Sequence, residues 1–296
     1  MTPIRPRRSI LYMPAANARA LDKAKTLAAD GIIIDLEDAV APDAKDAARE
    51  QAAGAVRAGG YGRREVIIRV NGLGTPWGEA DLRAAACSGA DAILLPKVQS
   101  AKDLQAFRAL LSSCGAPPSL PIWAMMETPL AILNAADIAA AGPAEKNPLA
   151  VFVMGTNDLA KETRAALGGG RIGMLPWLSA CIAAARAYGI DVLDGVYNTI
   201  GDEAGFRAEC AQGRLIGMDG KTIIHPSQIP ACNEIFSPAP EEVAWAKTVI
   251  AAFALPENAG KGVIAVDGRM VEIMHADMAQ RVMAIAGAIA ETEAGR

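Results

Sequence analysis

Eight short runs of aliphatic residues recur along the chain, and Ala-rich stretches with charges on one side separate them. Near-continuous apolar strands indicate burial on both faces, as in a parallel sheet. Eight strand–helix units within roughly 250 residues are typical of a (β/α)8 barrel. We therefore expect an α/β fold, with a (β/α)8 barrel over residues 1–240 and C-terminal helices over residues 241–296. The runs cover residues 9–14, 31–38, 65–72, 91–97, 120–127, 149–155, 190–196 and 221–226.

A doubly wound open sheet is the alternative architecture, but it is expected to contain fewer strands. A sheet of that kind that binds a dinucleotide carries a GxGxxG motif after its first strand. No such motif follows residues 9–14. The barrel is therefore the favoured prediction.

The composition excludes several classes of protein. Of the 296 residues, 52% are hydrophobic, which is enough for a sizeable core. The five cysteines are scattered without CxxC spacing, so they predict neither a zinc site nor disulfides, and they indicate a cytoplasmic protein. No apolar run reaches the roughly 18 residues that a membrane span needs. The net charge of -4 and the 4% aromatic content argue against a nucleic-acid partner.

Polar residues follow almost every predicted strand. In a (β/α)8 barrel the active site lies at the C-terminal ends of the strands, so these side chains are expected to share one rim. Any one of them could simply cap a helix. Charges that share a cavity of low dielectric constant must, however, be paired or hold a metal. The residues concerned are Asp35, Glu37, Asp38, Arg69, Asn71, Lys97, Glu127, Asn157, Asp158, Asp194 and His225.

Glu127 and Asp158 are the strongest metal candidates, because they follow adjacent strands and a carboxylate pair with waters is a usual site for Mg²⁺. The chain has no His or Cys cluster, which argues against zinc. Arg69 is unusual in an otherwise aliphatic strand. It could be a buried ion-pair partner of Glu37, or it could direct a planar cation at a carboxylate or a developing enolate.

Seven segments in order resemble the citrate lyase β-subunit-like proteins, a group that includes malyl-CoA, β-methylmalyl-CoA and citramalyl-CoA lyases within the HpcH/HpaI aldolase superfamily. The resemblance extends from about residue 7 to about residue 234, and more loosely to the C-terminus. The segments are RRSILYMPAANARALDKA, DGIIIDLEDAVAPDAKDAAR, VIIRVNGLGTPW, ILLPKV, METPLAI, GTNDLAKE and IIHPSQI.

The resemblance implies a Mg²⁺-dependent carbon–carbon lyase. Such an enzyme cleaves a β-hydroxyacyl-CoA thioester into a 2-keto acid and an acyl-CoA, or forms the thioester from these two compounds. The motifs place the two metal ligands at Glu127 and Asp158, and the residue that contacts the keto acid and enolate at Arg69. The carboxylates that support this arrangement fall on Glu37 and Asp38.

The same resemblance implies a CoA-phosphate site and a shared active site. Arg19, Lys23 and Lys25 are the basic candidates for the phosphates. Residues 262–291 are expected to form a helical lid that crosses to a neighbouring subunit of a homotrimer, or of a hexamer of two trimers. Glu272 stands where many relatives carry an aspartate that reaches into the neighbour's site.

Several alternatives remain open at this point. In a citrate lyase β subunit the thioester is carried by an acyl carrier protein. An aldolase of free keto acids fits less well, because no histidine follows the acidic residues at 37 and 38. The chain could also bind acyl-CoA without turnover. If the site activates a water, thioester hydrolysis follows, as in a malate synthase or a thioesterase.

Overall fold

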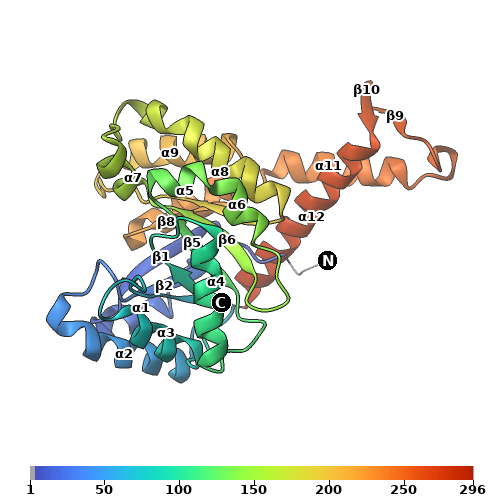
Figure 1. Cartoon of the computed structure of the whole chain (residues 1–296). Helices are drawn as coiled ribbons and strands as arrows, with labels where there is room; N and C mark the ends of the chain where they lie inside the picture. The colour runs from blue at the N-terminus through green and yellow to red at the C-terminus, as the bar shows by residue number, and fades with distance from the viewer. Residues whose placement is uncertain (1–3, 296) are drawn as a thin grey trace.

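Eight parallel strands close into a barrel in the computed structural model, which describes residues 4–295 (Figure 1). The strand order follows the sequence, and β1 pairs with both β2 and β8 to complete the ring. The prediction of a (β/α)8 barrel is confirmed. The strands are β1 (Ser9–Pro14), β2 (Gly31–Asp35), β3 (Glu65–Arg69), β4 (Ala92–Leu95), β5 (Ile122–Met126), β6 (Leu149–Met154), β7 (Asp191–Asp194) and β8 (Gly220–Ile223).

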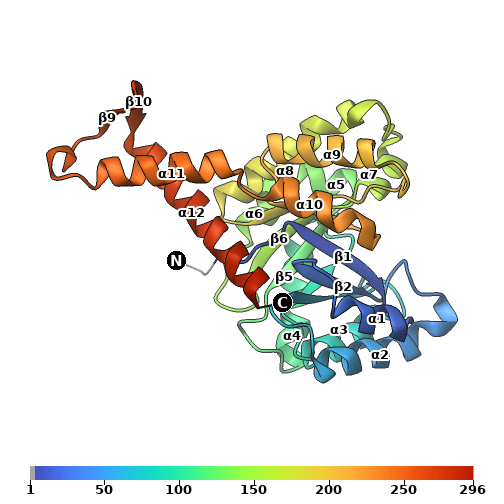
Figure 2. The same ribbon diagram turned by 180° about the vertical axis from the view of Figure 1, so that it is seen from behind.

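Helices surround the barrel in the order that the alternating pattern predicts (Figures 1 and 2). Several start with a side-chain cap: the side chain of Asn17, for example, accepts a hydrogen bond from the Ala20 N–H at 3.0 Å. The helices are α1 (Ala18–Ala24), η1 (Pro42–Ala44), α2 (Lys45–Ala58), α3 (Gly78–Ala86), α4 (Ala101–Ser113), α5 (Pro129–Leu133), α6 (Ala135–Ala140), α7 (Thr156–Thr163), η2 (Gly169–Met174), α8 (Leu175–Ala187), α9 (Glu203–Leu215), η3 (Pro226–Gln228) and α10 (Ile229–Phe236).

The strands divide their side chains between two apolar layers, because successive residues point to opposite faces. Ile10, Ile33 and Ile67 point into the barrel, where they join a cluster around the fully buried Trp123. Their neighbours, such as Ile34, pack outward against the helices in a larger cluster. This alternation decides which polar residues at the strand ends can face the cavity.

An ion-pair cluster closes the N-terminal end of the barrel. The Arg7 guanidinium contacts both carboxylate oxygens of Glu65, at 2.8 and 2.9 Å, and reaches Asp191 at 2.5 Å. It also lies over the ring of Trp123, 5.2 Å from the centroid. Because Trp123 is fully buried, this end of the barrel is filled by side chains.

Residues 240–294 form a C-terminal arm that leaves the barrel, runs outward and returns (Figures 1 and 2). Its helices pack on each other around their own small apolar cluster. The end of the arm returns to the barrel, where Glu293 pairs with Arg8 at 3.0 Å. The arm comprises α11 (Pro240–Phe253), η4 (Pro256–Asn258), β9 (Val263–Val266), β10 (Arg269–Glu272) and α12 (Ile273–Ala294).

The expectation of a helix within the lid segment, over residues 268–290, is wrong in its first part. Residues 263–272 form an antiparallel hairpin, and the helix begins only at Ile273. The turn of the hairpin is Asp267–Gly268, with φ of +49° and +75°. Asp-Gly is a strong signal for such a two-residue turn, and it was present in the sequence.

Within residues 4–295 no helix combines the length and the apolarity needed to cross a bilayer. The arm begins with α11 at Pro240, and the division of the chain into two regions there stays a prediction. The outer ends of the two expected regions, residues 1–3 and 296, lie outside the described residues.

Candidate active site

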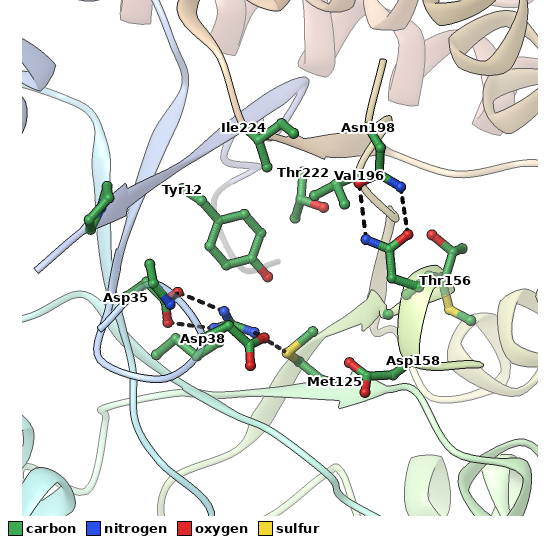
Figure 3. A pocket seen from close by; sticks show the side chains of 16 residues that line it. Tyr12, Asp35, Asp38, Met125, Thr156, Asp158, Val196, Asn198, Thr222 and Ile224 are labelled. Atoms are coloured by element: carbon green, nitrogen blue, oxygen red, sulfur yellow. Dashed lines mark hydrogen bonds and ion pairs between the residues drawn. The ribbon is translucent and has the colours of Figure 1, made fainter. Parts of the chain in front are cut away.

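A cavity of about 380 Å³ opens at the C-terminal ends of the strands (Figure 3). Five different strands contribute Tyr12, Asp35, Arg69, Met125 and Thr222 to its walls. All five side chains belong to the inward-facing set of their strands. The cavity is therefore at the face where the sequence placed the polar rim.

Arg69 is the cation at the centre of this cavity. Its Nε and Nη2 donate to the two carboxylate oxygens of Asp35, both at 2.7 Å. The parallel register pairs Asp35 directly with Arg69 at the ends of β2 and β3, so both side chains point inward from the same level. This bidentate contact fixes the plane of the guanidinium. Sequence reasoning considered Glu37 as the partner and missed Asp35.

Glu37 and Asp38 complete the acidic shell around Arg69. Their carboxylates lie 2.8 and 3.2 Å from Arg69 Nη1. Burial raises the pKa of Glu37 to about 8, and the neighbouring positive charge of Arg69 only partly offsets it. A carboxyl group with such a pKa can hold or release a proton near neutral pH.

A buried lysine holds the loop that carries these carboxylates. Lys45 Nζ donates to the carbonyl oxygens of Leu36 and Glu37, at 2.7 and 2.6 Å, and to Asn71 Oδ1 at 2.9 Å. Asn71 in turn donates to the Leu36 carbonyl at 2.9 Å. These contacts join the loops after β2 and β3, so the acidic shell and Arg69 are positioned together.

Asp158 lines the cavity, and Glu127 is buried behind Gly155, which is part of the cavity wall. Their role as metal ligands stays a prediction. Glu127 follows β5 and is 1% exposed, and Asp158 is in the first turn of α7. The Glu127 carboxylate fits under Gly155, where a Cβ atom would lie only 2.7 Å from Oε2. A larger residue at position 155 of the GTND segment would therefore overlap Glu127, so only glycine fits there.

The two carboxylate oxygens of Glu127 differ in their hydrogen bonding. Oε1 accepts the Lys97 N–H at 2.8 Å, whereas Oε2 is buried and has no hydrogen-bond partner among residues 4–295. A buried, unpaired carboxylate oxygen is costly unless something neutralises it. Burial accordingly raises the pKa of Glu127 to about 7, with the positive charge of Lys97 as a partial offset.

This donor set fits Mg²⁺. Two carboxylates offer hard oxygen ligands, and the ion usually keeps several waters of its own. Within residues 4–295, no three His, Cys, Asp or Glu side chains are grouped to hold a metal, so water or substrate would have to supply the remaining ligands.

Two further features of the cavity were not predicted. Tyr12 lies against Arg69, whose Cζ is 4.9 Å from the ring centroid, and burial raises the pKa of its hydroxyl. Asn157 and Asn198 exchange two amide hydrogen bonds, at 3.1 and 2.7 Å, across the wall beside Asp158 (Figure 3). The period-two alternation from Ile10 was the signal that could have identified Tyr12 as inward-facing.

Asp194, which was expected at the rim, does not reach the cavity. It points outward from β7 and pairs with Arg171 at 2.6 Å and with Lys221 at 3.1 Å. This cluster is buried behind the sheet, where it links β7 and β8 to η2. His225, also placed at the rim, is exposed and its ring contacts Ser227 at 2.8 Å.

The three basic candidates for CoA phosphates lie at different levels of α1. Arg19 is exposed in the first turn, next to the C-terminal end of β1. Lys23 is exposed in the last turn, and Lys25 follows the helix, where it pairs with Asp22 at 3.3 Å. Arg19 is therefore closest to the cavity rim along the chain.

Glu272 does not line the cavity within one chain. It ends β10 at the far end of the arm, away from the barrel (Figure 1). Its backbone N–H donates to His275 Nδ1 at 3.0 Å. A catalytic role for Glu272 therefore requires a second chain.

Comparison with known proteins agrees with this geometry. The sequence profile of the HpcH/HpaI aldolase/citrate lyase family matches residues 8–226, and that of a carbon–carbon bond lyase of the TIM-barrel fold matches residues 176–289. A (3S)-malyl-CoA thioesterase of Cereibacter sphaeroides is 51% identical over 286 residues, which are 96% of each chain. The citrate lyase subunit beta of Escherichia coli is 34% identical, with 94% of this chain and 93% of the relative covered.

Among solved structures, CitE from Mycobacterium tuberculosis in complex with magnesium, acetoacetate and coenzyme A is similar, with a TM-score of 0.74 and 30% identity. The match covers 94% of this chain and 97% of that structure. A closed eight-stranded barrel and the family match over most of the chain lead to the same conclusion. The chain belongs to the HpcH/HpaI aldolase/citrate lyase family and is a carbon–carbon lyase of its citrate lyase β-subunit-like branch.

Proposed function

We propose that this enzyme uses Mg²⁺ held by Glu127 and Asp158 to cleave a malyl-type CoA thioester into a 2-keto acid and an acyl-CoA, or to form it from them. The observation that carries this proposal is the cavity itself. Asp158 and the guanidinium of Arg69, which Asp35 fixes, line it, and the unpartnered carboxylate oxygen of Glu127 lies directly behind Gly155 in its wall. A substrate with a carboxylate, a β-hydroxyl group and a thioester would direct its carboxylate and hydroxyl group to the metal and its thioester to the guanidinium.

The metal, when bound, supplies a Lewis acid that acidifies the substrate hydroxyl group. Loss of that proton allows the bond between the carbinol carbon and the thioester α-carbon to break. Arg69 Nη1 then stabilises the negative charge that develops on the thioester enolate, because Asp35 already holds the guanidinium in position. Protonation of the α-carbon gives the acyl-CoA.

Glu37 is suited to keep Arg69 in position and to exchange a proton with the cavity. It lies 2.8 Å from Arg69 Nη1 and is 16% exposed. Its pKa of about 8, raised by burial, lets both protonation states occur near neutral pH. Asp38 is 72% exposed and lies at the mouth, so its part in the proposal is to balance charge.

Hydrolysis of the thioester is the second candidate reaction. The relative at 51% identity is a (3S)-malyl-CoA thioesterase, whereas the citrate lyase subunit beta of Escherichia coli is 34% identical. In hydrolysis a water attacks the thioester carbonyl, the C–S bond breaks, and CoA leaves as the thiol. Malyl-CoA would then give malate and CoA.

Product identification separates these reactions. The protein is incubated with Mg²⁺ and malyl-, methylmalyl-, citramalyl- or citryl-CoA, and the products are identified by mass. Glyoxylate with acetyl-CoA from malyl-CoA indicates carbon–carbon cleavage, and malate with CoA indicates hydrolysis. Turnover of citryl thioesters alone would favour a citrate lyase subunit. Absence of turnover with all four would contradict the proposed function.

For the CoA phosphates we propose Arg19 as the main contact, because it is the basic residue of α1 at the cavity end. Lys23 and Lys25 lie further along the helix. The cytoplasm stays the predicted compartment, in view of the scattered free cysteines.

We further propose that the C-terminal arm covers the cavity of a neighbouring subunit in a homotrimer, or in a hexamer of two trimers. Met270, Ile273, Met274 and Met278 are exposed on it by 53–73%. An apolar surface of this kind favours burial against another chain. Glu272, between two of these residues, would then reach the partner's cavity.

Subunit mixing tests the shared site. Arg69→Ala and Glu272→Ala proteins are each expected to be inactive, and a mixture in which subunits exchange should regain part of the activity. Interfaces that join an intact Arg69 to an intact Glu272 account for the recovery. If the exchanged mixture of two inactive proteins stays inactive, the arm does not cross. If Glu272→Ala alone is fully active, Glu272 has no catalytic role.

A further inference from the structure

Lys97 places its side-chain ammonium between the two carboxylates of the candidate metal site. Nζ lies 2.6 Å from Asp158 Oδ1 and 3.5 Å from Glu127 Oε1. A single ammonium between two carboxylates is attracted by both and offsets one of their two negative charges. The ammonium therefore pairs with Asp158 and fills the space between the two carboxylates, which is the space that a divalent ion held by both would need.

The main chain at Lys97 is held independently of the side chain. Its N–H donates to Glu127 Oε1 at 2.8 Å, and its φ of +54° lies in the left-handed region, which non-glycine residues rarely occupy. The side chain is 39% exposed, so it has solvent to move into. The backbone can thus keep Glu127 oriented while the ammonium leaves.

We propose that the Lys97 ammonium is a built-in counterion that occupies the cation position of the metal-free enzyme and competes with Mg²⁺ for it. This inference rests on the proposed assignment of Glu127 and Asp158 as ligands. Two positive groups cannot both lie between these two carboxylates, because their repulsion is strong in a poorly solvated site. Binding of the ion therefore includes release of the ammonium. The ammonium also offsets the cost of a buried Glu127 carboxylate while the ion is absent.

Removal of the charge should strengthen Mg²⁺ binding. We expect Lys97→Met to bind Mg²⁺ about tenfold more tightly or better than the wild type, measured by calorimetry on the full chain without substrate. Lys97→Gly should do the same, and glycine accepts the left-handed backbone at this position. Lys97→Arg keeps a cation and should stay within a few-fold of the wild type.

Lys102→Met is the matched control, because Lys102 is exposed on α4 and its loss changes the net charge equally. It should leave the Mg²⁺ affinity unchanged. If the wild type binds no Mg²⁺, the metal assignment of the proposed function fails. If the wild type binds and the Lys97 variants bind equally or more weakly, the counterion proposal is overturned.

Thermal unfolding gives a second readout that needs no activity. In EDTA, Lys97→Met should unfold at a lower temperature than Lys102→Met, because Glu127 and Asp158 have lost their counterion. Added Mg²⁺ should raise its unfolding temperature by more than that of the wild type, since tighter binding stabilises more. If Mg²⁺ raises the unfolding temperature of the wild type and of Lys97→Met by the same amount, the Lys97 ammonium does not compete with Mg²⁺.

Discussion

Glu127→Gln and Asp158→Asn should each abolish lyase activity and weaken Mg²⁺ binding by more than about a hundredfold, because even residues behind the ligands change metal affinity by roughly 10- to 100-fold. Both changes conserve size and remove only the negative charge. Glu127 is fully enclosed, and glutamine fills the same space under Gly155. The measurements are calorimetric Mg²⁺ titration and product formation from malyl-CoA at saturating Mg²⁺.

Two exposed carboxylates serve as controls for this experiment. Glu145→Gln and Asp137→Asn remove the same charges from exposed positions of the barrel surface and should leave both quantities unchanged. Unfolding temperatures verify that all four variants are folded. Near-normal turnover by either site variant in trace Mg²⁺ would show that the ligands are assigned wrongly.

Arg69→Lys should lower kcat/KM by two or more orders of magnitude, which corresponds to about 2.7 kcal/mol of transition-state stabilisation. Lysine keeps the charge but cannot make the bidentate contact with Asp35 and also direct a donor into the cavity. Loss of a single donor to a developing oxyanion typically costs a similar amount. Steady-state kinetics with the identified substrate measure the effect.

Arg83→Lys is the matched control, because Arg83 lies exposed on α3 and pairs only with Glu79 among residues 4–295. Its rate should match the wild type. An Arg69→Lys protein with wild-type rates would show that Arg69 is a structural ion-pair partner. A variant that is slow only because it is partly unfolded would reveal itself by a lowered unfolding temperature.

The eight strands were predictable because each combines β-branched residues with burial on both faces. Except for β1, their C-terminal ends were placed too late. The run 31–38 includes Asp35, whose carboxylate accepts the N–H groups of Glu37 and Ala39 at 2.9 and 3.1 Å. These local hydrogen bonds turn the chain out of the sheet after position 35, and composition alone does not reveal them.

Glu127, Asp158 and Arg69 could be selected from the sequence because they stand at or just after strand ends and lie within distinctive segments. Their roles stay predictions. Their detailed partners could not be selected in the same way. Asp35 was hidden within an acidic group, and only the strand register selects it over Glu37. Asp194 sits at a strand end like the others, but the alternation turns it outward, toward Arg171. The arm hairpin was missed because the helical period was started at Met270, which lies within β10.

The plug formed by Arg7, Glu65 and Asp191 has a kinetic consequence. With the N-terminal end of the barrel filled, molecules enter and leave the cavity through its mouth at the opposite face. A small keto acid at the metal would lie deeper than the bulky CoA chain at the rim. In cleavage the acyl-CoA must then depart first, and in condensation the keto acid must bind first. The order of addition and release would therefore be imposed by steric access alone.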